Sequence, residues 1–571
     1  MTTSMHRALA DVLEVRTGAG ARELLAPGAG FRRRAEISRV TSLWLGELWR
    51  GVNAPERGMA LACTGSLARQ ESGPLSDLDL IVLHDHSIRA AEVADVAERL
   101  WYPIWDSGLG LDHAVRSVKQ CRQVASADLN VAGAMLDLAP LAGDAELVRR
   151  AVRQLAEDWR ANARKRLPEV VTHIAARHER FGELAQMLEP DLKEAKGGLR
   201  DMSVLRAVTA SWLADRPHGA VDEAYLFLLD VRDALQLVTG RPRTVLVKND
   251  QAEVAARLGF TDPDDLLSRI GTASRRVSAA TSHTLRRAGQ SQRMRLGRRG
   301  PRRPDMVPLQ PGVYAHDGEI VFGPLRGGTP DDEVLLPFRA AAVSARENLP
   351  LSPITARKLA ELPGPPVPWP AAARTEFVTL LGGRGLVATW DALDLAGVID
   401  VWLPEWAAVR DRPQHNPLHR HTVDRHSLEA VLEASKLTDR VARADLLLVS
   451  ALLHDLGKRP RVADHSAEGA RLVKPVVERM GWSPTDARTL TVLVAEHLTL
   501  MALATGQDPS DPETALRMAD VVGQQPSTLR LLAALTEADA RAAGPRTWTT
   551  GRASLMKDLV ARTLAVMDRR A

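Results

Sequence analysis

Helical patterning limits the possible folds of this chain more than any other sequence feature. From Leu147 to about Leu285 the sequence is nearly all helical in pattern, with long stretches rich in Arg, Ala, Leu and Glu. Only 4% of the residues are aromatic, a composition that favours helix over sheet. The 571 residues are too many for one hydrophobic core, and a prior of about 150 residues per domain gives three or four units. We therefore expect a multidomain, mostly helical protein.

Strand-like runs occur in two parts of the sequence. In the first part, Leu61 to Thr64 and Leu78 to Leu83 are short apolar runs bounded by turn-forming residues. In the second part, Val307 to Phe322 contains two short strand-like pieces around Ala315 to Gly318, which predict a hairpin. Together with the helical stretches, these runs predict a multidomain protein of the α+β class.

Charge and cysteine content exclude several classes of protein. The net charge of +4 is small for this length, so it does not by itself indicate a nucleic-acid partner. Eight arginines and no acidic residue lie between Arg286 and Pro304. We interpret this run as a solvated linker, because no aromatic residues that stack on bases are interleaved with it. Cys63 and Cys121 are the only cysteines, too few for a disulfide framework or a zinc–thiolate site.

The sequence also bears on location. Residues 1–10 contain no apolar core like that of a signal peptide. No stretch reaches the roughly 18 to 20 uninterrupted apolar residues that span a bilayer. A cytoplasmic protein without a membrane partner is expected.

A pair of carboxylates, Asp77 and Asp79, brackets the first residue of the apolar run Leu78 to Leu83. Residues i and i+2 of a strand point to the same side, so both carboxylates are expected at one locus. Two carboxylates this close repel each other unless a cation lies between them. Because Mg²⁺ takes carboxylate and phosphate oxygens together, the pair predicts a magnesium site.

Upstream of this pair, Gly65, Ser66 and Arg69 lie where a short strand ends and a helix is expected to begin. Backbone N–H groups at a helix start, a hydroxyl and a guanidinium predict a site that binds a triphosphate. Gly-Ser, ten residues and then Asp-x-Asp resembles the nucleotidyltransferase superfamily that includes DNA polymerase β. The resemblance implies transfer of a nucleoside monophosphate from an NTP, with release of pyrophosphate and two metal ions at the reacting oxygens.

The same resemblance implies a third carboxylate from a later strand. Asp112, which follows a Gly-Leu-Gly turn, and Asp137, in an apolar run, are both candidates. Asp128 ranks lower because its surroundings are helical in pattern. We predict Asp137 as the third catalytic carboxylate, with Asp112 as the alternative.

Histidines and acidic residues are concentrated in the C-terminal third. His454-Asp455 follows the apolar run Leu446 to Leu453, and adjacent His and Asp at a helix end can supply two ligands to one metal. Lys458 follows closely, either as a helix cap or as a catalytic group that stabilises phosphoryl charge. Four further residues of these types lie in the same region, namely His426, His465, His497 and Asp539.

The order His, His-Asp, Asp on helices resembles the HD-domain phosphohydrolases, which are all-helical. The resemblance implies that His426, His454, Asp455 and Asp539 bind a metal, and that His465 and His497 contribute to a second metal. A divalent ion such as Mn²⁺ would lower the pKa of water and make it a nucleophile at neutral pH.

Longer strings resemble the bifunctional enzymes that attach a nucleotide to the nitrogen-signalling protein PII and remove it. These strings are Leu188 to Lys193, Lys196 to Asp201, Trp105 to Gly108, His113 to Arg116, Leu403 to Glu405 and Gln414 to His426. The resemblance runs from about Gly65 to Arg552. It implies that Lys193 and Arg200 bind the nucleotide, although a structural turn at Gly197-Gly198 with solvated charges is the alternative.

The resemblance implies transfer of UMP from UTP to a tyrosine of PII and hydrolysis of the ester in the separate HD site. AMP from ATP remains open. Two alternatives are consistent with the same motifs: an RNA nucleotidyltransferase of the tRNA CCA-adding type with an HD hydrolase, and a non-catalytic regulator that binds PII. Nucleic acid is not an expected partner.

The expected domains are a nucleotidyltransferase head (1–150), a helical domain (151–285), the basic linker (286–304), a connector (305–395) and the HD domain (396–571). Members of the PII-modifying family usually continue into two ACT domains that bind glutamine. This chain ends about thirty residues after Asp539. The sequence is therefore either truncated or a short form that lacks these domains and is regulated otherwise, and in a short form glutamine control through such domains is not expected.

Overall fold

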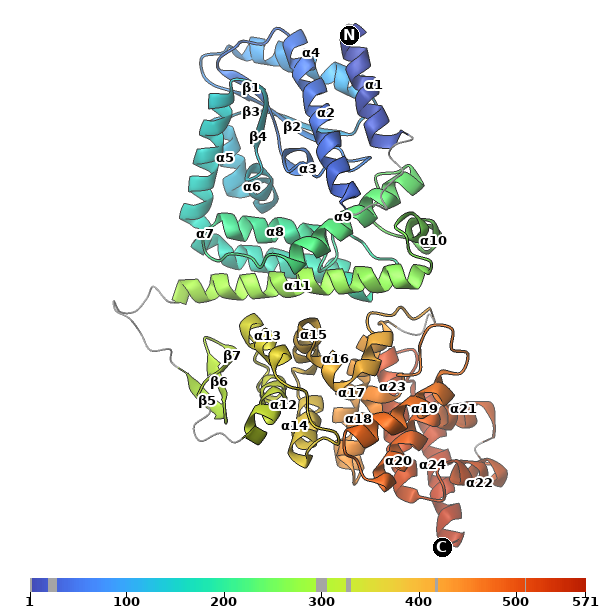
Figure 1. Cartoon of the computed structure of the whole chain (residues 1–571). Coiled ribbons are helices and arrows are strands. Elements are labelled where there is room, and N and C mark those ends of the chain that lie inside the picture. The colour runs from blue at the N-terminus through green and yellow to red at the C-terminus, as the bar shows by residue number, and fades with distance from the viewer. Residues whose placement is uncertain are drawn as a thin grey trace. The chain divides into compact units, whose positions relative to one another are not determined.

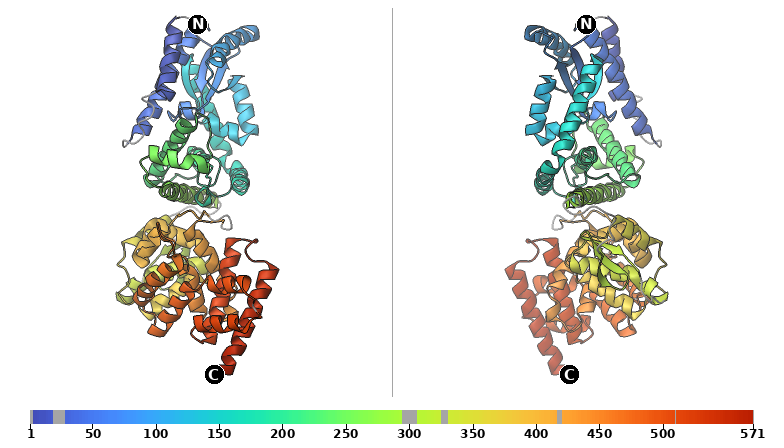
Figure 2. Two further views of the ribbon diagram at one scale, coloured as in Figure 1. Left: turned by 90° about the vertical axis from the view of Figure 1, so that its right-hand side faces the viewer. Right: turned by 90° about the vertical axis from the view of Figure 1, so that its left-hand side faces the viewer.

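The computed structural model describes residues 3–18, 28–293, 306–324, 330–415, 420–508 and 510–570. The chain forms two compact units, Met1–Arg299 and Gly300–Ala571 (Figures 1 and 2). The boundary lies inside the arginine-rich run predicted as a linker. Residues 286–293 of that run are not linker, because they continue helix α11 (Pro263–Arg293). Arg, Ala, Gln and Ser are all accepted in helices, and the first proline of the run is Pro301. The remainder, 294–304, lies outside the described residues.

Unit 1 is built on a four-stranded mixed sheet with the order β3-β2-β1-β4. The strands are β1 (Met59–Cys63), β2 (Leu78–His84), β3 (Leu111–Ser117) and β4 (Ala139–Gly143). Strand β1 pairs antiparallel with both β2 and β4, whereas β2 and β3 are parallel. Helix α4 (Ala90–Asp106) forms the crossover that a parallel pair requires.

Both faces of this sheet are buried. On one face, Leu61 and Leu80 pack with helices α2 (Ala29–Gly51) and α4. On the other face, Ala60 and Ile81 pack with α5 (Val118–Ala127), α6 (Leu129–Met135) and the start of α7 (Ala145–Phe181). Burial on both sides explains why β2 reads as an almost continuous apolar run.

The second part of unit 1 is helical, as predicted. Its helices α8 (Leu199–Ala210), α9 (Ala220–Thr239), α10 (Lys248–Arg257) and α11 enclose a separate hydrophobic cluster. The N-terminal helix α1 (Thr3–Thr17) packs against α2 (Figure 1). The sheet and this helical layer together position the first candidate site.

Unit 2 begins with a small antiparallel sheet of strands β5 (Val307–Gln310), β6 (Val313–His316) and β7 (Glu319–Phe322). The pair β6–β7 is the predicted hairpin, and its turn residues Asp317 and Gly318 have φ angles of 51° and 80°. Strand β5 pairs with β6 and is a third strand beyond the two predicted pieces.

Helices make up the rest of unit 2. They are α12 (Pro330–Glu347), α13 (Pro353–Glu361), α14 (Ala371–Leu381), α15 (Leu386–Ala396), α16 (Val398–Trp402), α17 (Val423–Ser435), α18 (Ala444–Leu453), α19 (His465–Arg479), α20 (Pro484–Ala495), α21 (Thr499–Gly506), α22 (Pro512–Val521), α23 (Pro526–Ala543) and α24 (Thr550–Arg570).

One hydrophobic core runs through unit 2, from Val313 of β6 to Met567 of α24. Residues of the predicted connector 305–395 therefore share a core with residues 396–571. The predicted multidomain α+β class, with a mixed-sheet unit followed by helices, is confirmed. Within the described ranges, no single helix is long and apolar enough to span a bilayer, although the bent pair α20–α21 passes on length and composition together.

Candidate functional site

Three carboxylates meet at one end of the sheet in unit 1. Asp77 directly precedes β2, and Asp79 is the second residue of that strand. Asp112 is the second residue of β3 and lies opposite Asp79 in the parallel register, so both point to the same side. Burial, together with the negative charges of Asp77 and Asp112, raises the pKa of Asp79 to about 6. A bound cation would relieve the repulsion between these three carboxylates.

Gly65 is required at its position for a steric reason. It has a φ of 62°, and a Cβ atom there would lie 2.3 Å from Oδ2 of Asp79. The Thr64 N–H donates to the Asp79 carbonyl over 3.0 Å, which holds the turn against β2. Ser66 follows in α3 (Gly65–Ala68), which is a single helical turn. Gly65 and Ser66 therefore lie directly beside the carboxylate cluster.

Two of the three predicted nucleotide-binding cations act on this cluster. The positive charges of Lys193 and Arg69 both act to lower the pKa of Asp79, against burial and the neighbouring acids. Arg200 instead pairs with Glu194 over 2.9 Å. Lys193 precedes the Gly197-Gly198 turn, whose own role is structural, because the Gly197 N–H donates to the buried Asp201 carboxylate over 2.7 Å.

Asp137 is engaged elsewhere. It lies in the turn between α6 and β4, where its carboxylate accepts a hydrogen bond from Arg69. Arg69 also pairs with Glu71 over 2.7 Å. The structure therefore favours Asp112 over the predicted Asp137 as the third carboxylate. Asp112 lies opposite Asp79 because β2 and β3 pair in parallel, although helix α4 separates the two strands in the sequence. The sequence around either residue does not indicate this pairing.

Arg16, at the end of α1, was not found from sequence. Its side chain is only 1% exposed. Its Nε donates to the Pro74 carbonyl over 3.1 Å, and its Nη2 donates to the Ser76 carbonyl. Burial lowers the pKa of Arg16 to about 10 against the opposing charge of Asp77. Arg16 thus holds the loop that precedes Asp77. It belongs to no motif, so the sequence alone gave no signal for it.

Helix α9 also holds this loop. The Leu75 N–H donates to Oε1 of Gln236 over 3.0 Å, and Arg232 donates to the Glu71 carbonyl over 3.0 Å. The loop between Gly65-Ser66 and Asp77 is therefore fixed by side chains from both the N-terminal helix and the helical layer.

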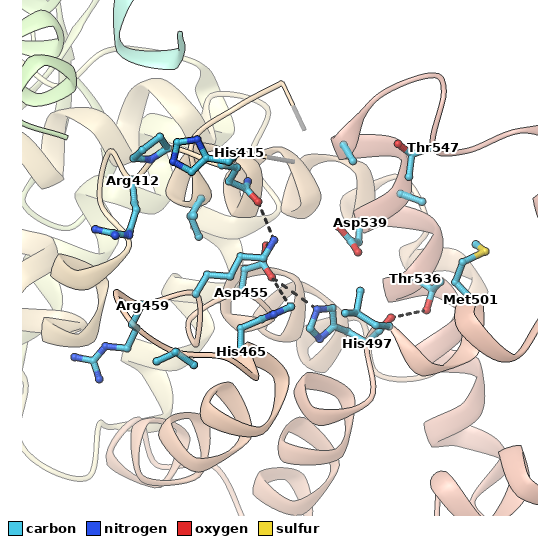
Figure 3. Close-up of a pocket in the computed structure, with 18 residues that line it drawn as sticks. Arg412, His415, Asp455, Arg459, His465, His497, Met501, Thr536, Asp539 and Thr547 are labelled. Atoms are coloured by element: carbon cyan, nitrogen blue, oxygen red, sulfur yellow. Dashed lines mark hydrogen bonds and ion pairs between the residues drawn. The ribbon is translucent and has the colours of Figure 1, made fainter. Parts of the chain in front are cut away.

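The second predicted site assembles in unit 2. Its residues come from five helices or their ends: His426 from α17, His454 and Asp455 from just after α18, His465 from the start of α19, His497 from just after α20 and Asp539 from α23. Figure 3 shows Asp455, His465, His497 and Asp539 around one cavity. The structure brings together all six residues predicted to bind metal here.

The distances within this cluster suit metal coordination. Nε2 of His426 lies 2.8 Å from Oδ1 of Asp539, and Nε2 of His454 lies 3.3 Å from Oδ2 of Asp455. The Nε2 atoms of His465 and His497 lie 3.9 and 3.7 Å from Oδ1 of Asp455. Two triads, His426/His454/Asp455 and Asp455/His465/His497, each have ligand atoms within 4.8 Å of one another. Asp455 belongs to both triads and can bridge two ions.

Backbone contacts set the tautomers of two of these rings. Nδ1 of His454 lies 2.8 Å from the Ala451 carbonyl, and Nδ1 of His497 lies 2.8 Å from the Val494 carbonyl. Because a carbonyl only accepts, each Nδ1 carries a hydrogen, and each Nε2 is the ring atom that faces the carboxylates. Neutral imidazole with this orientation is the form that binds divalent metals.

The electrostatics of the cluster point to the same conclusion. Burial disfavours a charged His454, but the carboxylates of Asp455 and Asp539 outweigh it and raise its pKa to about 9. Burial and the neighbouring His454 charge lower the pKa of His497 to about 4. The two carboxylates thus favour positive charge at His454. A metal ion would supply that charge, and the imidazole and carboxylate donors fit such an ion.

Gly457 allows α19 to approach this cluster. A Cβ atom at Gly457 would lie 2.0 Å from the His465 carbonyl and 2.4 Å from the Gly469 nitrogen. The turn after His454-Asp455 therefore packs directly on the helix that carries His465.

Lys458 is bound to the cluster itself. Its Nζ lies 2.7 Å from Oδ2 of Asp455 and donates to Oε1 of Gln414 over 2.8 Å. These contacts place it at the carboxylate that both triads share, which favours a role in the site over a helix cap. Gln414 begins the string Gln414 to His426 that resembles the PII-modifying enzymes, but it was not predicted as a site residue.

A cavity of about 490 Å³ opens onto this cluster. Such a volume accepts a ligand much larger than a phosphate ion. Its lining combines metal-cluster residues, cationic side chains and an apolar wall. The lining residues outside the cluster include Arg412, Gln414, His415, Arg459, Leu498, Met501, Thr536, Ala540, Ala543 and Thr547.

Comparison with known families matches both halves of the chain. The family described as GlnD PII-uridylyltransferase matches residues 165–285, and the HD domain family matches residues 423–571. The HD match covers His426, His454, Asp455, His465, His497 and Asp539.

Curated relatives match along almost the whole sequence. A bifunctional uridylyltransferase/uridylyl-removing enzyme of Streptomyces coelicolor is 46% identical over 95% of this chain and 66% of its own length. Enzymes of that name from Mycobacterium tuberculosis and Corynebacterium glutamicum are 41% and 38% identical, over 69% and 70% of their lengths. The chain thus spans about two thirds of the length of these relatives. It belongs to the family of bifunctional uridylyltransferase/uridylyl-removing enzymes.

Proposed function

We propose that this chain transfers UMP or AMP from the corresponding NTP to a tyrosine of PII and hydrolyses the resulting ester in a separate site. The observation that carries the proposal is the presence of two complete clusters, one of carboxylates beside Gly65-Ser66 and one of histidines and aspartates in the HD helices. Complete clusters also count against a non-catalytic PII-binding regulator. The family description names PII, and no observation favours an RNA substrate.

In the transferase site, Asp77, Asp79 and Asp112 would hold Mg²⁺, which supplies charge stabilisation for the triphosphate when bound. Gly65, Ser66 and Lys193 would bind the phosphates, because they surround the same carboxylates. The tyrosine hydroxyl attacks the α-phosphorus, the bond to the β-phosphate oxygen breaks, and pyrophosphate leaves. Arg69 lies between the cluster and Asp137, where it can orient the nucleotide.

In the hydrolase site, His426, His454, Asp455 and Asp539 would hold one divalent ion such as Mn²⁺, and His465 and His497 would hold a second one through Asp455. A bound metal supplies Lewis acidity toward the phosphate ester. Lys458 keeps Asp455 in place and offers positive charge beside the phosphorus. Water attacks phosphorus, the bond to the tyrosine oxygen breaks, and the nucleotide and free tyrosine leave.

Intact-mass measurement of PII tests this function. PII incubated with the chain and UTP, or with the chain and ATP, is expected to gain the mass of one nucleotide per PII chain with one of the two. Removal of the NTP should then return the original mass. CTP or ATP with tRNA serves as the control for an RNA substrate, and label entering tRNA but not PII would contradict the proposal.

The assignment of the third carboxylate leads to a prediction. Asp112→Asn is expected to lower the rate of transfer to PII about 10²-fold, because it removes a metal-binding oxygen beside Asp79. Asp137→Asn removes one partner of Arg69 and should cost about tenfold or less. Initial rates at saturating NTP measure both. A larger loss in Asp137→Asn than in Asp112→Asn would restore the sequence-based choice.

Arg16 provides a prediction about metal dependence. Arg16→Lys keeps the charge but loses the two-pronged contact with the Pro74 and Ser76 carbonyls. We expect the Mg²⁺ concentration for half-maximal transfer to rise about tenfold, since buried carbonyls left unpaired cost about 1–3 kcal/mol and free the Asp77 loop. Hydrolysis in unit 2 should not change. Arg39→Lys, at an exposed arginine of α2, is the control. An unchanged Mg²⁺ requirement would show that the clamp has no role in metal binding.

A further inference from the structure

The cavity of the HD unit has two chemically different sides. In the view of Figure 3, Arg412 and Arg459 lie on one side of the metal cluster, whereas Met501, Thr536 and Thr547 lie on the other. Leu498 directly precedes α21, which carries Met501, and Ala540 and Ala543 belong to α23, which carries Thr536. The lining that these elements contribute on this side is therefore mostly apolar. The scissile phosphate belongs at the cluster between the two sides, so each side faces one of the two groups that the phosphate joins.

Thr547 is the unusual residue of the apolar side. Its hydroxyl oxygen is buried and has no hydrogen-bond partner among the described residues. A buried hydroxyl without a partner costs free energy, which a ligand atom in the cavity would recover. Leu498, on the same side, is a large apolar side chain that is 47% exposed. An unpaired hydroxyl and an exposed apolar side chain in the lining of one cavity suit a ligand that has both flat apolar faces and polar edges.

The two ends of the substrate differ in what they can offer to this side. A tyrosyl group has its only polar side-chain atom at the phosphorus, and it must remain attached to its protein. A nucleoside is the free end of the ester, so it can be enclosed, and it has ribose hydroxyls and base edges away from the phosphorus. Only the nucleoside therefore offers a partner to Thr547 and an apolar face to Leu498 and Met501.

We propose that the apolar side of the HD cavity, formed by Leu498, Met501, Ala540, Ala543 and Thr547, binds the nucleoside of the ester, with the Thr547 hydroxyl as its buried hydrogen-bond partner. This inference rests on the proposed hydrolase function and assigns it a nucleotide-recognition site. The HD unit would then recognise the nucleoside as well as hydrolyse the phosphate ester. UMP and AMP share the required chemistry, and the experiment separates them.

The test is equilibrium binding by calorimetry on the full chain with Mn²⁺, in the Asp79→Asn background to silence the transferase site. The probes are UMP, AMP, inorganic phosphate and phenyl phosphate, the last as a mimic of the tyrosyl end. Thr547→Val is expected to weaken binding of UMP or AMP about tenfold and to leave phosphate and phenyl phosphate unchanged. Thr547→Ser, which keeps the hydroxyl, should bind within about twofold of the parent.

Leu498→Ala should weaken the same nucleotide several-fold, and Leu555→Ala, a control at a leucine of α24 that is 40% exposed, should not. Unchanged nucleotide binding in Thr547→Val would overturn the proposal. A selective loss of phenyl phosphate would assign this side to tyrosine and would also overturn it, as would an equal loss of inorganic phosphate. Hydrolysis of modified PII is measured on the same proteins. Absence of hydrolysis in the parent would refute the proposed function. This outcome is distinct from unchanged nucleotide binding in Thr547→Val, which would refute only the nucleoside site.

Discussion

Replacing Asp455 by alanine is expected to abolish removal of the nucleotide from modified PII while transfer continues. Asp455 belongs to both histidine triads, so its loss removes a ligand from each candidate metal position. His454→Ala should have a similar effect, because its Nε2 faces both Asp455 and Asp539. The loss of hydrolysis should be at least about 10²-fold in each variant. Release of UMP or AMP from purified modified PII measures it.

The controls for this prediction separate metal loss from unfolding. His316→Ala, at a histidine on strand β6 of the same unit, should leave hydrolysis unchanged. The two site variants should also bind less metal, as measured by elemental analysis after dialysis against Mn²⁺. A chelator should stop both activities of the native chain. If Asp455→Ala still removed nucleotide at the native rate, the hydrolase site would have to lie elsewhere.

The residues of the histidine cluster were grouped through their resemblance to the HD-domain phosphohydrolases, because His426 and Asp539 are far apart in the sequence. The local signal was the pair His454-Asp455 directly after an apolar helix. The orientation of the rings could not be predicted, because it depends on carbonyls such as that of Ala451. The position of Thr547 could not be predicted either, since no motif surrounds it.

The carboxylate site was predicted less completely because it depends on pairing between distant strands. Asp77 and Asp79 follow from the alternation of a single strand, and Gly65 follows from its position before a helix. Asp112 becomes a neighbour of Asp79 only through the parallel register of β2 and β3. Arg16 reaches the site from a helix at the other end of the unit's sequence. Both features are tertiary, and local pattern contains neither.

The fold shows the same division between local and long-range features. The helical stretch after Leu147 and the hairpin at Asp317-Gly318 were predicted because each rests on short-range periodicity or turn chemistry. The arginine-rich run was predicted as linker from its charge, yet residues 286–293 extend α11. Charge repulsion along a helix costs little when water solvates the side chains, so composition alone did not locate the helix end.

Asp79→Asn is expected to lower nucleotide transfer to PII by at least about 10²-fold and to leave hydrolysis of modified PII intact. Burial and the neighbouring negative charges of Asp77 and Asp112 raise the pKa of Asp79 to about 6, and a cation there would relieve the repulsion between the carboxylates. Asn keeps the shape of the side chain but removes the charge that binds the ion. Asp77→Asn should act in the same direction, because Asp77 lies directly before the same strand.

The matched control is Asp85→Asn, just beyond the other end of β2, where the carboxylate accepts a hydrogen bond from the Ser87 N–H over 2.9 Å and does not face the cluster. Transfer is measured as the initial rate of label entering PII from UTP or ATP, and hydrolysis as release from PII modified beforehand. Separate loss is required because the two clusters share no residue and lie in different units of the chain. Near-native labelling of PII by Asp79→Asn would refute the carboxylate site, and a parallel loss of hydrolysis would mean that the two activities depend on one metal centre.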